Sequence, residues 1–294
     1  MPRSEPFPNA PEPLCTPTYD GSGQCVHPDV VAVGGRFYGA RYVMAVEPYA
    51  FGDDRLENPS LLTSHDGETW VEAPGVPAPL VPAPPTGGWN SDGDLARDDA
   101  RLLLYYRCNS GRGETRLCLK ESVDGTRWSE AEELFTVEVS GEFASPAVTV
   151  GEGVFRMFYV DSLRCQIRAL ESRDGRRWRA AASVLDFPNA WHLDAVLRDG
   201  VPYLLVNDRH SLFLLRGAAS GRFSVYDPAR ERWLPLGPAA KPVPLMVPSR
   251  GGWDGEILYR GSLLLEGGLL KIWYSARSPQ NVWRVGYTDG RLRE

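Results

Sequence analysis

Short segments in which apolar and polar residues alternate follow one another along most of this chain, and helical periodicity is nearly absent. Alternation with a period of two is typical of a half-buried β-strand. The clearest of these predicted strands are rich in aromatic residues and cover 36–46, 101–108, 154–161, 201–208 and 269–276. The pattern therefore predicts an all-β protein.

A second, shorter pattern precedes each aromatic strand by about ten residues and predicts a further strand. Its five copies are HPDVV at 27–31, DGDLA at 92–96, SPAVT at 145–149, HLDAV at 192–196 and DGEIL at 254–258. Successive copies begin 65, 53, 47 and 62 residues apart, and a polar turn separates each copy from the aromatic strand behind it. A pattern that recurs at this spacing is the signature of a repeat architecture.

The motif Ser-x-Asp-Gly-x-x-Trp also recurs, at 64–70, 122–128 and 172–178. An Asp-Gly pair between alternating segments predicts a tight hairpin with a type I′ turn. The tryptophan that follows would begin the outer strand and pack between neighbouring units. The fourth unit carries a degenerate form at 225–233, and the fifth reaches only YTDG at 287–290.

Each unit therefore has four predicted antiparallel strands in about 40 to 60 residues, which describes one blade of a β-propeller. Five units predict a five-bladed β-propeller with four-stranded antiparallel blades around a central channel. We expect residues 1–294 to form a single propeller domain whose N-terminal segment helps to close the ring.

Composition narrows the classes of function. The chain is 43% hydrophobic and 24% charged, which is ordinary for a globular protein, and its net charge of −6 argues against a general nucleic-acid partner. No apolar run approaches the roughly 18 residues that a membrane helix needs, and the first residues show no signal peptide. We expect synthesis in the cytoplasm, which is compatible with a virion-associated protein. Only three Gln residues occur, which fits a thermophilic source.

The five cysteines match no zinc-binding spacing. Cys108 and Cys118 flank a predicted turn, so they either face each other across a hairpin or remain free thiols. The state of Cys15 and Cys25 is likewise left open by the sequence.

The blade rhythm and the repeated Ser-x-Asp-x-x-x-Trp turn resemble the five-bladed propellers of glycoside hydrolase families 43, 32 and 68. Segments such as HPDVV, ENPSLLTSHDGETW and YRGSLLLEGGLLKIWYSA are also similar to uncharacterised phage and bacterial propellers, some of them tail-associated. The first resemblance implies the fold and a glycan as ligand. The second implies a place in a virion.

In a propeller the first strand of each blade lines the channel, and its first residues reach the mouth. Because a strand directs every second side chain to one face, the inner ring is expected to be one of two sets. One set is Asp29, Asp94, Asp194 and Glu256, and the other is His27, Asp92, His192 and Asp254. Crowded carboxylates shift one another's pKa values, so that one can act as an acid and another as a base.

The resemblance to family 43 implies a catalytic Asp in blade one, an Asp in blade two and a Glu in blade three. The corresponding candidates are Asp29, Asp94 and Glu142, although His27-Pro28 and Ser145-Pro146 stand where the family has carboxylates. The residues predicted to bind substrate are His27, Glu57, Trp89, Asp92, Arg107, His192, Asp194, Asp254, Glu256, Arg260 and Arg277. No metal-binding residues are predicted among them. A Ca²⁺ ion in the central channel would nevertheless suit the oxygen atoms of the Asp residues.

These observations lead to three functional hypotheses. The first is a carbohydrate-recognising propeller, a virion or tail component that binds a host glycan or polysaccharide beside other tail proteins. The alternative is an active, divergent glycoside hydrolase that uses paired carboxylates in the central pocket. A protein-interaction scaffold is a second alternative, against which the crowded charges argue. Arg107, Arg260 and Arg277 indicate an acidic sugar as the ligand.

Overall fold

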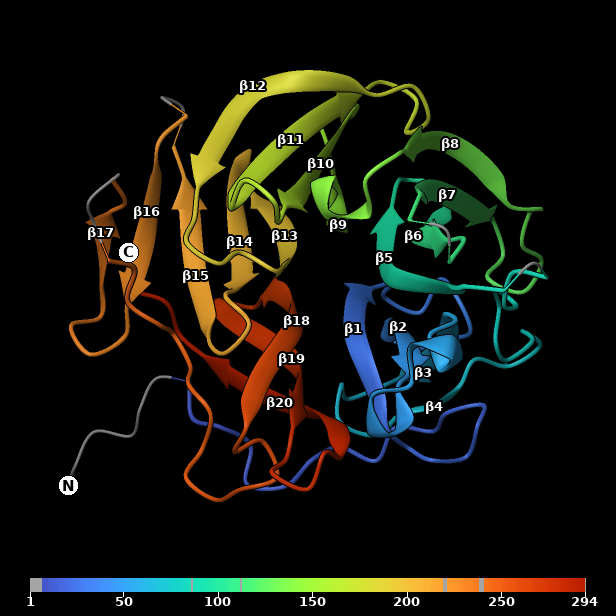
Figure 1. Ribbon diagram of the computed structural model, residues 1–294, viewed down its shortest axis with the longest axis horizontal. Coiled ribbons are helices and arrows are strands. Elements are labelled where there is room, and N and C mark those ends of the chain that lie inside the picture. The colour runs from blue at the N-terminus through green and yellow to red at the C-terminus, as the bar shows by residue number, and fades with distance from the viewer. Residues whose placement is uncertain (1–6, 86, 112, 219–220, 238–240, 294) are drawn as a thin grey trace.

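The computed structural model describes residues 7–85, 87–111, 113–218, 221–237 and 241–293, which form five antiparallel sheets arranged around a central axis (Figure 1). Blade one consists of β1 (Cys25–Ala32), β2 (Tyr42–Pro48), β3 (Ser60–Ser64) and β4 (Val71–Glu72). Blade two consists of β5 (Trp89–Arg97), β6 (Leu102–Asn109), β7 (Thr115–Ser122) and β8 (Glu132–Val137). Blade three consists of β9 (Ala144–Gly151), β10 (Val154–Asp161), β11 (Gln166–Ser172) and β12 (Arg179–Asp186).

The last two blades depart from four strands. Blade four has five strands: β13 (His192–Arg198), β14 (Val201–Asn207), β15 (Leu212–Gly217), β16 (Phe223–Asp227) and β17 (Arg232–Pro235). Blade five has three: β18 (Ile257–Glu266), β19 (Leu269–Arg277) and β20 (Trp283–Gly290). The five-bladed, all-β prediction is confirmed, and the degenerate motif at 225–233 forms the β16–β17 hairpin, one strand later than expected.

The N-terminal segment lies along blade five, where the Leu14 N–H donates to the carbonyl of Val285 in β20 at 2.8 Å. The Trp253 indole N–H also donates to the Ala10 carbonyl at 2.9 Å. Within the described residues this segment contains no strand. That the whole of 1–294 is one domain stays a prediction.

The core lies between the blades rather than inside any one of them. In β2, Val43 and Ala45 belong to the apolar cluster shared with blade two, whereas Tyr42 and Met44 belong to the cluster shared with blade five. All seven residues of β2 are buried. A middle strand of a blade is thus covered on both faces, which explains why apolar residues occupy successive positions in the aromatic strands.

The Ser-x-Asp-Gly motif forms a longer loop than the two-residue turn predicted from the sequence. In blade one the strand pairing ends at Thr63 and Val71. The Asp66 carboxylate accepts hydrogen bonds from the N–H groups of Glu68 and Thr69 at 2.8 and 2.7 Å. These N–H groups therefore bind a side chain and not the partner strand, as they would in a hairpin with a type I′ turn. The type I′ prediction is therefore wrong, because the Asp side chain organises the loop.

The glycine of each motif meets an aromatic side chain of the preceding blade. The Gly67 carbonyl accepts from the Trp273 indole of blade five at 2.7 Å and from its own Trp70 at 3.0 Å. The Gly175 carbonyl accepts from the Tyr105 hydroxyl of blade two at 3.0 Å. Trp70 also packs on Trp273 of blade five and Trp178 on Tyr105 of blade two, so the predicted packing of these tryptophans between units is confirmed.

All five cysteines carry free thiols. Cys108 and Cys118 form a diagonal pair on neighbouring strands, because Cys108 pairs with Arg116 and Cys118 with Tyr106, and their side chains are hydrogen-bonded to each other across the hairpin.

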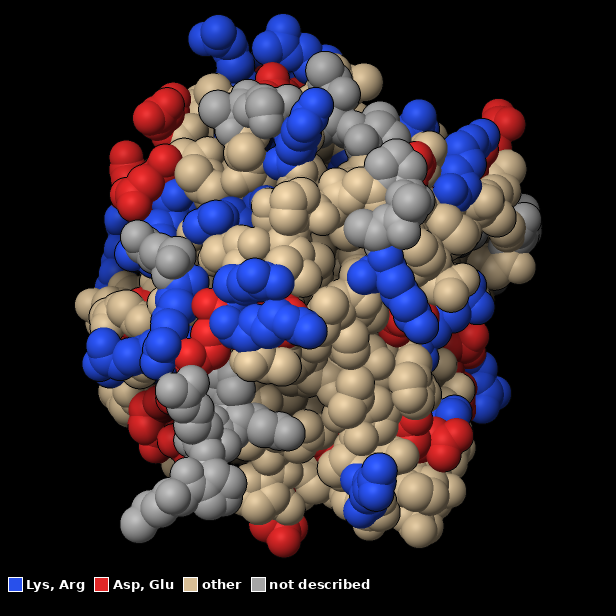
Figure 2. Space-filling view, turned by 90° about the vertical axis from the view of Figure 1, so that its left-hand side faces the viewer, with Lys and Arg blue, Asp and Glu red and all other residues tan. Residues whose placement is uncertain are grey.

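Figure 2 shows the flank on which β16 and β17 lie, where charges of both signs are interspersed and no continuous basic surface is visible. The helices in the described part of the chain are single turns of three residues, far too short to cross a bilayer.

Candidate active site

Bulges near the start of β1 and β5 direct one residue of each strand to the mouth of the channel. The register of β1 with β2 shifts between Val26 and Asp29, and that of β5 with β6 shifts between Ser91 and Asp94. His27 and Asp92, inside these bulges, have φ angles of 51° and 55°. Bulges frequently re-aim a side chain beside a functional site, and here they turn two polar side chains towards one point.

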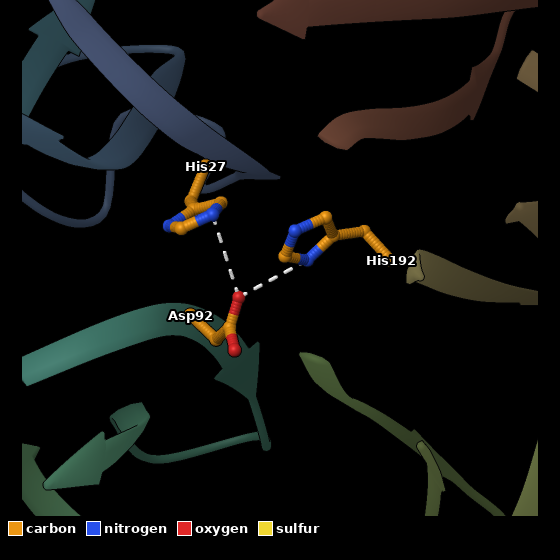
Figure 3. A group of neighbouring side chains, drawn as sticks. All are labelled: His27, Asp92 and His192. Atoms are coloured by element: carbon orange, nitrogen blue, oxygen red, sulfur yellow. Dashed lines mark ion pairs between the residues drawn. The ribbon is translucent and has the colours of Figure 1, made fainter. Parts of the chain in front are cut away.

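His27, Asp92 and His192 converge on that point from blades one, two and four (Figure 3). The Asp92 Oδ1 atom lies 3.5 Å from His27 Nε2 and 3.2 Å from His192 Nδ1. All three side chains are buried. In the described part of the chain, none of these three atoms has a hydrogen-bond partner.

A second layer of contacts fixes the orientation of these side chains. His27 Nδ1 lies 2.7 Å from Glu47 Oε2, and the other oxygen of Glu47 accepts the Gly93 N–H at 2.8 Å. The second oxygen of Asp92 accepts from Arg107 at 2.6 Å. A carboxylate behind a ligating histidine is the usual second-shell arrangement of a metal site, because it sets the ring orientation and the tautomer.

The surroundings give His192 and Asp92 the protonation states that a cation requires. Burial lowers the pKa of His192 to about 3, despite the opposing charge of Asp92, so its imidazole is neutral at ordinary pH. Burial alone would raise the pKa of Asp92, but His27, Arg107 and His192 outweigh it and hold that pKa well below the ordinary value. The site therefore presents a carboxylate and at least one neutral imidazole.

These residues fit a divalent cation. The free atoms of His27, Asp92 and His192 lie within 4.8 Å of one another, and unpaired buried polar atoms of this kind need a partner. Two imidazole nitrogens and one carboxylate oxygen are a donor set of zinc and similar transition metals. No metal site was predicted from the sequence, because these three residues lie 65 and 100 positions apart.

A second ring lies one step further along the channel. Asp29, Asp94 and Asp194 also bring one carboxylate oxygen each within 4.8 Å of one another. Burial raises the pKa of each of the three, and the charges of Asp94 and Asp194 add to the effect at Asp29. The members of both expected sets from blades one, two and four thus reach the channel, since residues two apart on a strand share one face, whereas the members predicted from blade five do not.

The Arg260 guanidinium, which is fully buried, lies between the two rings. It approaches Asp29 at 3.6 Å and Asp94 at 3.7 Å in the second ring, and Asp92 at 3.9 Å in the first. Beyond the second ring the channel continues as a cavity of about 330 Å³, lined mainly by Val, Ala and Leu. Arg260 thus supplies a positive charge to carboxylates that have no access to bulk water.

Two further groups stand beside the histidines. Burial, followed by the charges of Glu47 and Asp92, raises the pKa of Glu57 well above its ordinary value. The Tyr259 ring stacks on His27 with a centroid distance of 5.4 Å, and its hydroxyl accepts the Trp191 indole N–H at 3.2 Å. The site therefore holds a carboxyl group that keeps its proton to a higher pH than an exposed Glu and a hydroxyl whose own proton is free to be donated.

The structure separates the remaining predicted residues from this centre. In blade five, β18 begins only at Ile257, so the inner position predicted for Asp254 and Glu256 is wrong. Asp254 instead accepts hydrogen bonds from Asn9 and Tyr274 at 2.6 and 3.0 Å. The true inner residue is Ser262, which sequence reasoning missed because the repeat pattern in this blade is displaced.

Glu142 also lies away from the two rings. Glu142 is in the short helix η3 (Ser140–Glu142) and pairs with Arg164 at 3.0 Å on the surface. Trp89 begins β5 and is partly buried. Asp29 and Asp94 each use one carboxylate oxygen to bind a neighbouring blade, and the catalytic role predicted for them stays a prediction.

The three arginines taken to indicate an acidic sugar are engaged within the chain. Arg107 binds Asp92, Arg260 lies among the channel carboxylates, and Arg277 pairs with Glu256 at 3.3 Å. Their charges are thus opposed by carboxylates of the protein itself, which removes the reason for expecting an acidic ligand.

Comparison with known proteins places the fold among carbohydrate-active enzymes. No family model matches the chain. A 112-residue stretch is 34% identical to the A type blood N-acetyl-α-D-galactosamine deacetylase of Flavonifractor plautii. That stretch covers 36% of this chain and 14% of the length of that protein.

Two solved structures resemble the whole chain. A crystal structure of an N-acetylgalactosamine deacetylase from F. plautii, in complex with blood group B trisaccharide, has a TM-score of 0.74 at 20% identity and covers 97% of this chain and 95% of that one. The family 43 endo-arabinanase of Bacillus licheniformis has a TM-score of 0.57 at 12% identity, with coverage of 94% and 96%. The chain is thus a five-bladed β-propeller that resembles family 43 glycoside hydrolases and this deacetylase. The resemblance to phage tail proteins has no support in these comparisons.

Proposed function

We propose that this protein is a metal-dependent hydrolase that removes the N-acetyl group from an amino sugar of a glycan. The observation that carries the proposal is the convergence of His27, Asp92 and His192, whose buried free atoms suit a divalent cation. The likeness to an N-acetylgalactosamine deacetylase supports the choice of reaction, and the likeness to an endo-arabinanase supports a glycan as the substrate class.

His27 Nε2, Asp92 Oδ1 and one ring nitrogen of His192 would hold the cation. A bound Zn²⁺ or similar ion polarises a carbonyl oxygen and makes a water molecule more acidic. Imidazole ligands do not suit Ca²⁺, which prefers oxygen. The Ca²⁺ ion predicted from the sequence would bind Asp29 and Asp94, whose carboxylates already lie close to the positive charge of Arg260. This ion stays a prediction.

The residues around the histidines supply the proton transfers that amide hydrolysis needs. Glu57 takes a proton from the attacking water, whose oxygen bonds to the carbonyl carbon of the acetamide. The Tyr259 hydroxyl oxygen accepts the Trp191 indole N–H, which leaves the hydroxyl proton as the donor towards the substrate. That proton is donated in a hydrogen bond to the carbonyl oxygen of the acetamide. Glu57 then returns the proton to the nitrogen as the C–N bond breaks, which releases acetate and leaves a free amine on the sugar.

An N-acetylated amino sugar, which is neutral, fits the charge of the site better than an acidic sugar. Arg107 and Arg277 are paired with carboxylates, and Arg260 is fully buried. Trp191 and Tyr259 are only partly buried beside the histidines, so an aromatic edge remains for contact with the apolar face of a sugar ring.

The test is acetate release by the purified full chain. After treatment with a chelator, the protein is supplied with Zn²⁺ or Mn²⁺ and incubated with oligosaccharides that contain N-acetylgalactosamine or N-acetylglucosamine. We expect acetate only with metal present, and at least a 100-fold lower rate in His192→Ala. His65→Ala is the matched control, because His65 is exposed in the loop of the first motif.

The same experiment separates the alternatives. Release of reducing sugar without acetate would favour a glycoside hydrolase, and binding of a glycan without any product would favour recognition alone. An absence of both binding and product would favour the interaction scaffold. Any of these results would overturn the deacetylase proposal. Association with a virion or tail stays a prediction from the sequence, which the identity of neighbouring genes would test.

A further inference from the structure

Phe51 has a backbone conformation that a bulky residue rarely adopts. It lies in the short helix η1 (Ala50–Gly52), between β2 and β3, with φ 54° and ψ 24°. For a residue with a large side chain, this left-handed region is strained. The ring does not repay the strain by burial, because Phe51 is 64% exposed.

Two side chains from distant segments hold this conformation. The Phe51 N–H donates to Gln24 Oε1 at 3.2 Å, and its carbonyl accepts from Asn281 Nδ2 at 2.9 Å. The same oxygen of the buried Gln24 also accepts the Trp283 N–H at 3.2 Å. The first and fifth blades therefore fix the position of Phe51 from both sides. Strain that the surroundings enforce in this way is characteristic of ligand-binding segments.

A continuous row of aromatic rings joins this segment to the candidate active site. Tyr259 stacks on His27 at 5.4 Å, Trp283 lies 5.2 Å from Tyr259, and Tyr49 lies 5.2 Å from Trp283. Phe51 follows Tyr49 by two residues. The row thus runs from the histidines, across the junction of blades five and one, to Tyr49, two positions before the exposed ring of Phe51.

Trp283 adds an independent sign that this junction is built for a ligand. Its side chain is almost fully buried, yet in the described part of the chain its indole N–H has no hydrogen-bond partner. Buried indole N–H groups normally find an acceptor. A sugar hydroxyl entering the junction could provide one.

We propose that Phe51 is the stacking platform for a second, neutral sugar ring, so that this protein acts on an amino sugar within an oligosaccharide. The inference rests on the proposed function for the position of the first ring at the histidines. Stacking needs only the C–H face of a hexose, which an exposed apolar ring can cover. The strained backbone presents this ring in the free protein, so little ordering remains to be done on binding.

The test compares binding of an N-acetylhexosamine and of a trisaccharide that contains it, by isothermal titration calorimetry. We expect Phe51→Gly to weaken trisaccharide binding about tenfold and to leave monosaccharide binding unchanged. The melting temperature should stay the same or rise, because glycine adopts positive φ without strain. Phe51→Trp should retain trisaccharide binding.

Val123→Ala is the matched control, because Val123 is also an exposed apolar residue, at 66%, beside the second Asp-Gly loop. Equal trisaccharide binding by Phe51→Gly and the wild type would overturn the inference. So would a lower melting temperature of Phe51→Gly together with loss of both ligands, because that result indicates a structural role.

Acetate release, measured in parallel, keeps the two proposals apart. Trisaccharide binding that depends on Phe51 without acetate release would overturn only the proposed reaction. Acetate release that is insensitive to Phe51 would overturn only the stacking platform. An absence of binding of either sugar to the wild type would overturn both.

Discussion

Asp29, on the inner strand of blade one, accepts a hydrogen bond from the backbone N–H of Leu95 in blade two at 2.6 Å, in the buried wall of the channel. Each further junction between blades has an equivalent link. The other donor–acceptor pairs are Val148 N–H to Asp94, Leu193 N–H to Ser145, Leu263 N–H to Asp194 and Val30 N–H to Ser262, at 2.7 to 3.0 Å. A ring of five buried hydrogen bonds thus joins the five blades at the axis.

This ring predicts that Asp94 acts on stability rather than on chemistry. Asp94→Ala should lower the free energy of unfolding by about 2 kcal/mol, because the buried Val148 N–H loses its acceptor. Asp94→Asn should lower it less, since the amide oxygen still accepts. Urea denaturation measures both, with Asp99→Ala as the control because Asp99 is exposed. A stable Asp94→Ala variant without activity would contradict this prediction and restore the catalytic role.

The glycine of the first motif should tolerate no side chain. Gly67 has φ 89°, and a Cβ atom there would lie 3.0 Å from the Trp273 ring. Gly34→Ala is the matched control, because Gly34 has φ 57° with open space around it. We expect Gly67→Ala to lower the free energy of unfolding by about 1 kcal/mol more than Gly34→Ala, because it adds a clash to the same backbone strain. Equal losses would show that the blade junction adapts to the methyl group.

The three Asp-Gly loops predict a specific dependence of stability on pH. Backbone N–H donors lower the pKa of Asp66, Asp124 and Asp174 in the folded chain. Each carboxylate therefore contributes stability that is complete above its ordinary pKa near 4 and is lost as the pH falls below it. A triple Asp→Asn variant should lose less stability than the wild type between pH 6 and pH 3, as urea midpoints would show. Parallel losses would mean that these loops do not sense pH.

Much of the fold could be predicted because its signals are local. The aromatic strand predicted at 154–161 is β10, and the one at 269–276 lies within β19. The prediction of a type I′ turn failed because the Asp66 side chain determines the conformation of that loop. Prediction also failed in blade five, where the Asp-Gly pattern at 254–258 precedes the inner strand instead of beginning it.

The sequence by itself determined the number of blades and the class of residues in the channel, because strand alternation and turn residues act within a few positions along the chain. Only the tertiary structure decided which of those residues meet. Three tertiary features decide this: the bulges at His27 and Asp92, the closure of the ring of blades, and the position of Arg260 in the channel. The groups that they bring together or keep apart are more than 50 residues apart in the sequence. His27, Asp92 and His192 become one candidate metal site for that reason, whereas Asp29 and Asp94 become the links that hold the blades.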